Sequence, residues 1–317
     1  MRTIDHLKRR YLVKAILSTN DLAYRLGTTA QRLREIAREI EGNRETHYRL
    51  KIEISKKNPT KVRHLWVPKP ELKAIQSALR RLFQAIPLNS CAHGAVRKRS
   101  PRTNASKHLG QQWVVNMDVK DFFPSVRHYV VRDMLRREYG FGRDVAWLIT
   151  RLVTLRAGLP QGTPTSPLFA NLVLTNGVDS SVSSAAGLVG AENTRFLDDV
   201  TLSGDGPQSL IGITARALSA KRLKVWRATR KKPKFKIVPN SVRQEVTGLI
   251  VNSKSGPSVP REYRDRVRAA VNELQSLHGR ESSQSALSIA GRIAYVKQNN
   301  PGAARRLQRQ FDKIMNG

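Results

Sequence analysis

Hydrophobic and polar positions alternate over residues 113–118, within the stretch WVVNMDVKDFFPS. A period of two residues predicts a β-strand, with Val115 and Met117 on one of its faces. Asp118 then lies on the opposite face, at the carboxyl end of the strand. A Pro-Ser pair at 124–125 breaks the pattern soon afterwards, so we expect the Asp118 carboxylate to point into a cleft rather than into a core.

A second short pattern surrounds two adjacent aspartates, Asp198 and Asp199, in TRFLDDVTLSG at 194–204. Two apolar runs around a pair of turn-forming residues predict a β-hairpin whose turn carries both carboxylates. Like charges this close raise each other's pKa, and Mg²⁺ relieves the conflict because it prefers oxygen ligands. With Asp118, three carboxylates would clamp two metal ions about 4 Å apart for phosphoryl transfer. Surface aspartates in an ordinary turn are the alternative.

The same two periods predict the remaining elements. Helices are expected at 1–45, 71–86, 128–154, 166–174 and 207–222 and from 260 onwards, a hairpin at 47–68, and strands at 224–240 and 243–252. Thr28 or Thr29 is expected to cap a helix after Gly27. DLAYRLGTTAQRLREIA at 21–37 also resembles a helix-turn-helix, but a small helical cap is the preferred interpretation.

The charge of the chain is strongly positive, with 57 Lys and Arg against 24 Asp and Glu in 317 residues and a formal net charge of +33. Basic residues recur throughout, which predicts a polyanionic partner along the whole body. No run of 18 apolar residues and no amphipathic basic helix supports a membrane partner. Cys91 is the single cysteine, which excludes an internal disulfide or a cysteine-based zinc site; with no apolar signal region, this predicts a cytoplasmic protein.

Two segments suit a nucleoside triphosphate. The hairpin at 47–68 has a basic tip with Lys56 and, close by, Arg63, whose planar guanidinium matches phosphate oxygens. A solvated charged hairpin is the alternative. GLPQGTPTSPLFANLVL at 158–174 begins with a Gly/Pro-rich turn that contains Gln161 and leads into a helix, which leaves backbone room for a nucleotide.

In this order, NMDVKDFFPS, GLPQGTPTSPLFANLVL and FLDD resemble the palm motifs of reverse transcriptases, and the resemblance covers residues 47–310. NASKH at 104–108 and VTG at 246–248 resemble two signatures of bacterial retron reverse transcriptases. The resemblance implies an α+β right-hand polymerase with an antiparallel palm sheet backed by helices. It divides the chain into an N-terminal helical segment (1–45), fingers (46–112 with parts of 126–165), palm (113–125 and 166–252) and a helical thumb (253–317).

The resemblance also implies a catalytic site with two Mg²⁺ ions. Asp118 and Asp198 would ligate both metals, Asp199 would lie alongside as the third catalytic carboxylate, and the carbonyl oxygen of Val119 would complete one metal's shell. Phe123 has the offset from Asp118 of the family's aromatic gate. Its ring would clash with a 2′-hydroxyl and so favour deoxynucleotides; a core aromatic is the alternative.

Contacts with the incoming deoxynucleoside triphosphate are implied for four further positions. Lys56 and Arg63 match the triphosphate-gripping positions of the fingers, and Gln161 matches the turn residue that contacts the nucleotide. Lys234, or Lys236, matches the lysine proposed to protonate the leaving pyrophosphate. A contact with the duplex backbone is the alternative role for that lysine.

Retron enzymes bind a structured non-coding RNA and copy part of it. Synthesis starts from the 2′-hydroxyl of a guanosine and leaves a branched RNA–DNA product. The resemblance implies this RNA template and primer, its DNA product and deoxynucleoside triphosphates as partners, with an effector protein in antiphage defence as a further candidate. The residues implied to contact or position the RNA are Asn104, His108, Val246, Thr247 and Gly248; maintenance of the fold is their alternative role.

One departure is clear: Phe196-Leu197 precedes the two aspartates where the family usually has Tyr-Ala. The metal ligands are kept, so we expect the chemistry to survive while primer positioning and fidelity change. Two other readings remain open. One is a different reverse transcriptase class, intron-encoded or abortive-infection; the other is a non-catalytic RNA-binding scaffold.

Overall fold

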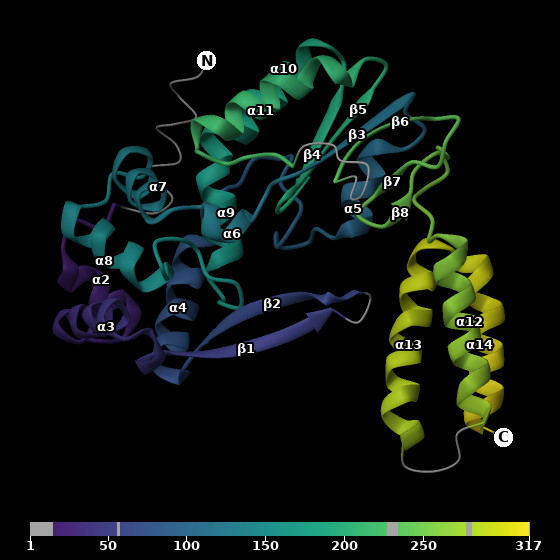
Figure 1. Cartoon of the computed structure of the whole chain (residues 1–317), viewed down its shortest axis with the longest axis horizontal. Helices are drawn as coiled ribbons and strands as arrows, with labels where there is room; N and C mark the ends of the chain where they lie inside the picture. Colours follow the sequence, from purple (N-terminus) through teal and green to yellow (C-terminus); the bar gives the residue numbers. More distant parts are fainter. Residues whose placement is uncertain (1–14, 56–57, 227–233, 277–280, 317) are drawn as a thin grey trace.

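The computed structural model, which describes residues 15–55, 58–226, 234–276 and 281–316, contains a four-stranded antiparallel sheet (Figure 1). The strand order is β4-β5-β3-β6. The strands are β3 (Trp113–Asp118), β4 (Glu192–Phe196), β5 (Asp199–Gly204) and β6 (Phe235–Pro239). β3 is therefore an inner strand, with β5 and β6 on either side of it.

The alternation along β3 is confirmed, because its two faces lie in different surroundings. Val115 and Met117 are buried in the main hydrophobic core. Val114 is buried on the other face, in a small cluster with Val246 and Leu249. Asp118 shares the face of Val114 but lies at the end of the strand, where it is only half-buried.

Helices cover the core face of the sheet, and α10 and α11 lie together beside it (Figure 1). The expected helix after the Gly/Pro-rich turn is α9 (Ser166–Leu174), and the one after the aspartate hairpin is η5 (Pro207–Ser209) with α11 (Leu210–Ala220). The periodicity does not predict that α9 continues as a helix through η4 (Thr175–Asp179) and α10 (Ser180–Leu188).

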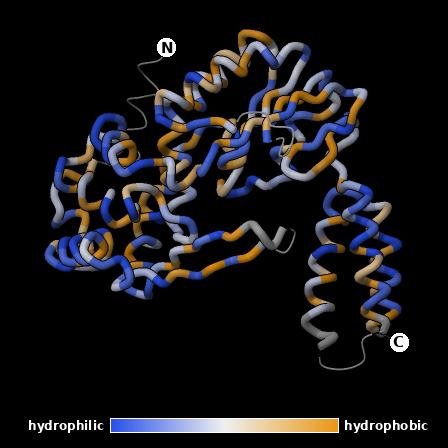
Figure 2. Tube along the Cα trace, viewed as in Figure 1, coloured by the Kyte–Doolittle hydropathy of each residue, from blue (hydrophilic) through white to orange (hydrophobic). Residues whose placement is uncertain are grey.

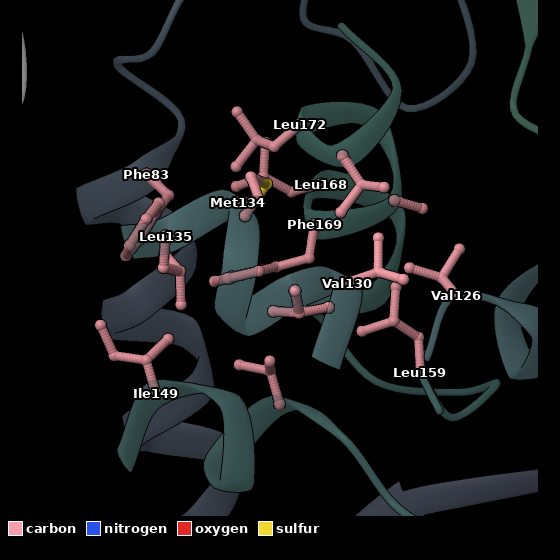
Figure 3. Packing of buried hydrophobic residues seen from close by; sticks show 14 of the residues in the cluster. Phe83, Val126, Val130, Met134, Leu135, Ile149, Leu159, Leu168, Phe169 and Leu172 are labelled. Atoms are coloured by element: carbon pink, nitrogen blue, oxygen red, sulfur yellow. The ribbon is translucent and has the colours of Figure 1, made fainter. Parts of the chain in front are cut away.

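The main core extends from the sheet into a group of helices built largely from the first half of the chain. These are α2 (Thr19–Leu26), α3 (Ala30–Gly42), α4 (Pro70–Phe83), α6 (Phe122–Ser125), α7 (His128–Asp133), η3 (Met134–Glu138) and α8 (Arg143–Val153). Phe83 meets Phe169 of α9 at 5.0 Å between ring centroids (Figure 3). Phe83 also stacks on Phe141 at 5.5 Å. The contact with Phe169 joins α4 to α9, the helix that follows the Gly/Pro-rich turn.

The expected cap of α3 is confirmed. Gly27 ends α2 with a left-handed φ of 68°, and the Thr29 hydroxyl accepts a hydrogen bond from the Arg32 amide at 3.1 Å. α3 packs against α8, and the guanidinium of Arg32 is held by Glu71 at 2.8 Å. These contacts agree with a helical cap rather than a DNA-reading helix.

A two-stranded hairpin, β1 (Tyr48–Ser55) and β2 (Asn58–Pro68), projects from the helical group (Figure 1). Glu53 pairs with Arg63 on one of its faces, and Ile54 pairs with Val62 on the other. Its base is fixed to the Gly/Pro-rich turn, because the Trp66 amide donates a hydrogen bond to the Gln161 carbonyl at 2.7 Å. Lys56, at the expected basic tip, lies outside the described residues.

Two segments differ from expectation. The polar connector before β3 contains α5 (Pro101–Ala105) and η2 (Ser106–His108), started by a capping box at Ser100. The single strand expected at 243–252 is a small hairpin, β7 (Glu245–Val246) and β8 (Leu249–Ile250). Thr247 and Gly248 form its turn with φ of 49° and 79°, and two positive φ values in succession favour a tight turn over an extended strand.

The end of the chain forms a three-helix bundle with its own core (Figure 1). Its helices are α12 (Arg261–Ser276), α13 (Glu281–Asn299) and α14 (Pro301–Asn316). Hydrophilic and hydrophobic positions alternate along it (Figure 2), as expected for helices that bury one face. Tyr263 packs against both this core and the β7–β8 cluster, which Tyr295 of α13 also contacts. Within the described residues, no helix is both long and apolar enough to span a membrane.

Candidate active site

Three aspartates meet where β3 ends and the β4–β5 hairpin turns. Asp118 is the last residue of β3 and pairs directly with Asp199, the first residue of β5. The Asp198 carbonyl accepts a hydrogen bond from the Val119 amide at 3.0 Å. The hairpin is as expected, but its turn is made by Leu197 and Asp198, because Phe196 already pairs with Asp199. Two strand partners and one turn residue therefore bring the three carboxylates together.

The charges of neighbouring acids shift the pKa values of Asp198 and Asp199. Burial, followed by the charges of Asp198 and Asp118, raises the pKa of Asp199 to about 6. The pKa of Asp198 is also raised, first by burial and then by Asp118, while Lys234 and Arg63 lower it. The pattern is that of crowded like charges, which a bound cation would stabilise.

Lys234 supplies one such cation. Its ammonium lies 3.0 Å from both carboxylate oxygens of Asp118. In the part of the chain that the structure describes, no group of three or more acidic, His or Cys side chains has the spacing of a metal site. The donors are nevertheless the oxygens that Mg²⁺ prefers, so the residues fit a divalent ion once the ammonium leaves Asp118.

Trp226 is a site residue that the sequence did not reveal. Its amide donates to the Asp118 carbonyl at 2.9 Å. Its ring lies beneath two ammonium groups, Lys234 at 4.8 Å and Lys120 at 5.3 Å from the centroid, distances at which cation–π attraction holds a lysine in place. Of the two lysines left open by the sequence, Lys234 is the one that contacts Asp118; Lys236 is exposed on β6.

Phe123 and Gln161 lie on adjoining segments, and Phe123 follows Asp118 by five residues. Phe123 is half-buried in α6, with its ring 5.3 Å from that of Phe122. Its carbonyl accepts a hydrogen bond from the Leu159 amide at 3.2 Å, and Gly158 fits so closely that an added Cβ would lie 2.3 Å from the Pro124 carbonyl oxygen. The loop that carries Gln161 is therefore packed against the segment that carries Phe123.

Arg63 completes this side of the site. It lies on β2, exposed, opposite Glu53. Its charge is among those that lower the pKa of Asp198, so the guanidinium lies within electrostatic range of that carboxylate. A cation in that position suits the phosphates of a nucleotide.

The residues predicted to contact or position RNA separate into two groups. Asn104, His108 and Val246 are buried, where an RNA cannot reach them, whereas Thr247 is half-buried and Gly248 is exposed. The His108 ring bonds to the hydroxyls of Ser203 and Thr194, both at 2.7 Å.

The His108 ring thus joins β4, through Thr194, to β5, through Ser203. Burial, followed by the charges of His93 and Lys107, lowers its pKa to about 3, so the ring is neutral. Of the roles kept open for His108, this geometry favours maintenance of the fold over contact with RNA.

Comparisons with known proteins match most of the chain. A family model described as reverse transcriptase (RNA-dependent DNA polymerase) matches residues 54–251. Retron Mx65 reverse transcriptase of Myxococcus xanthus is 33% identical over 95% of this chain and 73% of the relative. Retron Mx162 reverse transcriptase of the same organism is 32% identical over 94% and 67%. Retron Ec86 reverse transcriptase of Escherichia coli is 29% identical over 70% and 68%.

A solved structure of telomerase from Candida albicans with a fragment of telomeric RNA covers 84% of this chain and 54% of that chain, with a TM-score of 0.47 and 10% identity. That likeness is too low to support a conclusion.

Proposed function

Since the chain belongs to the retron reverse transcriptases, which are RNA-directed DNA polymerases, we propose that it copies a structured non-coding RNA into DNA at the Asp118, Asp198 and Asp199 site. The observation that carries this proposal is the direct pairing of Asp118 with Asp199 beside the Leu197-Asp198 turn. Three carboxylates on one strand end and one hairpin can hold two Mg²⁺ ions, with the Val119 carbonyl as a further ligand.

When bound, the two ions supply charge stabilisation for the attacking hydroxyl and the leaving pyrophosphate. The chain's own residues prepare this arrangement. Asp118 and Asp198 are fixed by β3 and by the hairpin turn. Lys234 would move from Asp118 to the leaving pyrophosphate and give it a proton; its contacts with Asp118 at 3.0 Å and with the Trp226 ring support this proposal.

Nucleotide selection falls to residues on either side of the aspartates. Arg63 and Lys56 bind the triphosphate from the hairpin, and Gln161 contacts the nucleotide from the Gly/Pro-rich turn. Phe123 packs beneath the sugar and excludes a 2′-hydroxyl. The packing of Gly158 against Pro124 supports this assignment, because it keeps the turn and the gate in one rigid unit.

The polymerase subdomains are assigned on the same basis. The four-stranded sheet with its helices is the palm (113–125 and 166–252). The β1–β2 hairpin and neighbouring segments are the fingers (46–112 with parts of 126–165), after the N-terminal helical segment (1–45). The C-terminal bundle, with its separate core, is the thumb (253–317), whose basic helices would lie along a duplex backbone.

The product we propose is branched, with DNA attached to the 2′-hydroxyl of a guanosine in the RNA. Asn104, His108, Val246, Thr247 and Gly248 contribute to placing that RNA, with Thr247 and Gly248 as the members within its reach. A cytosolic antiphage system with an effector protein is the expected setting.

Sequencing the nucleic acid that copurifies with the protein, with and without debranching enzyme, tests this proposal. A defined RNA joined by a 2′–5′ linkage to complementary DNA is the expected result. Unbranched DNA that is primed from a 3′-hydroxyl would instead assign the chain to another reverse transcriptase class. RNA without DNA, from cells that express the chain with its neighbouring genes, would favour the non-catalytic scaffold.

A further inference from the structure

Arg195 of β4 is a fully buried cation behind the Leu197-Asp198 turn, with 1% of its surface exposed. Its Nε and Nη2 donate to the two carboxylate oxygens of Asp179, each at 2.8 Å. Its Nη1 donates to Asn171 Oδ1 at 2.8 Å and to the carbonyl oxygen of Leu197 at 3.0 Å. One guanidinium therefore joins a helix side chain, a buried carboxylate and the backbone of the catalytic turn.

The ion pair with Asp179 maintains the charge of Arg195 in the core. Burial alone would lower the pKa of Arg195, but the charge of Asp179 and its hydrogen bonds outweigh burial, and the pKa is raised. A bidentate pair fixes the plane of the guanidinium. The remaining Nη1 donor is thereby aimed at the Leu197 carbonyl rather than free to rotate.

The turn needs such a support because of its backbone. Leu197 has φ of 60°, a left-handed conformation that costs free energy in any residue with a Cβ. In two-residue hairpin turns, glycine is the usual residue at a first position with positive φ. Here the position is occupied by leucine, and the carbonyl of this strained residue is the group that Arg195 holds.

Asn171 and Gly94 form a second set of contacts around Leu197. The Asn171 side-chain amide donates to the Gly94 carbonyl at 2.9 Å. Gly94 lies so close to the turn that an added Cβ would be 2.6 Å from the Leu197 nitrogen. Asn171, Arg195 and Gly94 thus enclose Leu197, and Asn171 belongs to α9, the helix that follows the Gln161 turn.

We propose that Arg195, with Asp179 and Asn171, forms a positioning cluster that holds the Leu197-Asp198 turn in the conformation needed for metal binding by Asp198. None of the three touches the reacting groups; they act through the turn. The proposal rests on the proposed role of Asp198 as a metal ligand. The Arg195–Asp179 ion pair then has two effects, one on the stability of the fold and one on catalysis.

The test separates these two effects by removing the whole pair. Arg195→Met/Asp179→Leu replaces two buried charges with apolar side chains of similar size, a change that is often tolerated by the fold. We expect a melting temperature within a few degrees of wild type, but a kcat for RNA-templated extension lower by about 10- to 100-fold, as for small misplacements of reacting groups. The Mn²⁺ affinity of the RNA-bound protein, measured by electron paramagnetic resonance, falls in parallel.

Arg195→Lys is the second variant and decides the matter if the double variant does not fold. A lysine keeps the charge beside Asp179 but has no planar fork to reach Leu197, so the same loss of kcat and Mn²⁺ affinity is expected. Lys221→Met/Glu138→Gln is the matched control. It removes a half-buried ion pair, 3.1 Å between Lys221 Nζ and Glu138 Oε1, that does not contact the Leu197-Asp198 turn. We expect its kcat to stay at the wild-type value.

Two outcomes are distinguishable. A folded Arg195 variant with wild-type kcat and Mn²⁺ affinity overturns the positioning cluster, provided that Asp198→Asn is inactive in the same assay. If Asp198→Asn is itself fully active, the proposed metal site fails instead.

Discussion

Asp199 shows at the residue scale how the metal-free site opposes folding. Its pKa is raised from 3.8 to about 6 by burial and by two neighbouring carboxylates. The folded protein therefore binds this proton more tightly than the unfolded chain. The free energy of unfolding contributed by Asp199 is highest below pH 3.8 and decreases as the pH rises through about 6.

We accordingly predict that Asp199→Asn raises the melting temperature of the metal-free protein at pH 8 and leaves it nearly unchanged at pH 4. The gain is modest, because Asp199 as a whole residue is exposed to solvent, which screens the repulsion. Added Mg²⁺ reduces the difference at pH 8. Thermal denaturation in EDTA at both pH values measures the difference in melting temperature between the variant and the wild type. An equal increase in melting temperature at pH 4 would show that charge is not the cause.

Phe123 gives a prediction about substrate choice. Phe123→Ala removes the ring proposed to clash with a 2′-hydroxyl, and we expect the preference for deoxynucleotides over ribonucleotides to fall by at least about tenfold, the lower end of what a pocket contact contributes. Steady-state incorporation of each nucleotide by Phe123→Ala and by the core variant Phe122→Leu measures it. An unchanged preference in the Ala variant would remove the gate from the account.

Residues differ in how far the sequence reveals them. Asp118 and the aspartate pair are predictable because alternation and turn chemistry place them locally. Arg195 and Trp226 are not, because their partners Asp179 and Asp118 are distant in sequence and the pairing depends on the folded sheet. The left-handed conformation of Leu197 is not predictable for a related reason. A leucine does not favour this conformation, and residues distant in sequence maintain it.

At the element scale, the β4–β5 hairpin is held by contacts on both sides. His108 joins Thr194 and Ser203 from η2, while Arg195 holds the turn from the core. The hairpin itself follows from the sequence. The β7–β8 hairpin does not, since Thr247 takes a positive φ that residues with branched side chains rarely adopt. The start of α5 could have been recognised from Ser100 followed by Pro101.

A substitution at His108 tests the role of η2 in holding the hairpin. His108→Leu leaves two buried hydroxyls without their partner, and we predict a loss of about 1–3 kcal/mol in the free energy of unfolding for each. RNA affinity of the folded protein stays near the wild-type value, because the ring is buried. Urea denaturation and RNA binding by His108→Leu are compared with the exposed neighbour Lys107→Ala. A stable variant with lost RNA affinity would indicate direct contact instead.

The whole molecule combines a basic surface with an acidic site. The net charge of +33 indicates many phosphate contacts, and we predict that RNA affinity falls by about 10³-fold or more between about 50 and about 200 mM salt. Binding titrations at several salt concentrations measure the slope. A shallow slope, equivalent to one or two released ions, would show that the charge serves another purpose.

The arrangement of the parts is only partly readable from the sequence. Antiparallel pairing and the helical end follow from periodicity and from the palm motifs. The separate core of the C-terminal bundle and the packing of the Gln161 loop against α6 depend on contacts between distant segments, which periodicity does not specify. The resemblance to a family supplies that arrangement, and local pattern alone would leave it open.

The central claim is that Asp118 and the neighbouring hairpin hold the metal ions for DNA synthesis. Primer extension on an RNA template with Mg²⁺, by Asp118→Asn beside the exposed neighbour Asp121→Asn, tests it most directly. We predict that Asp118→Asn abolishes synthesis while RNA binding persists, and that Asp121→Asn extends normally. Normal extension by a folded, RNA-binding Asp118→Asn protein would contradict the account.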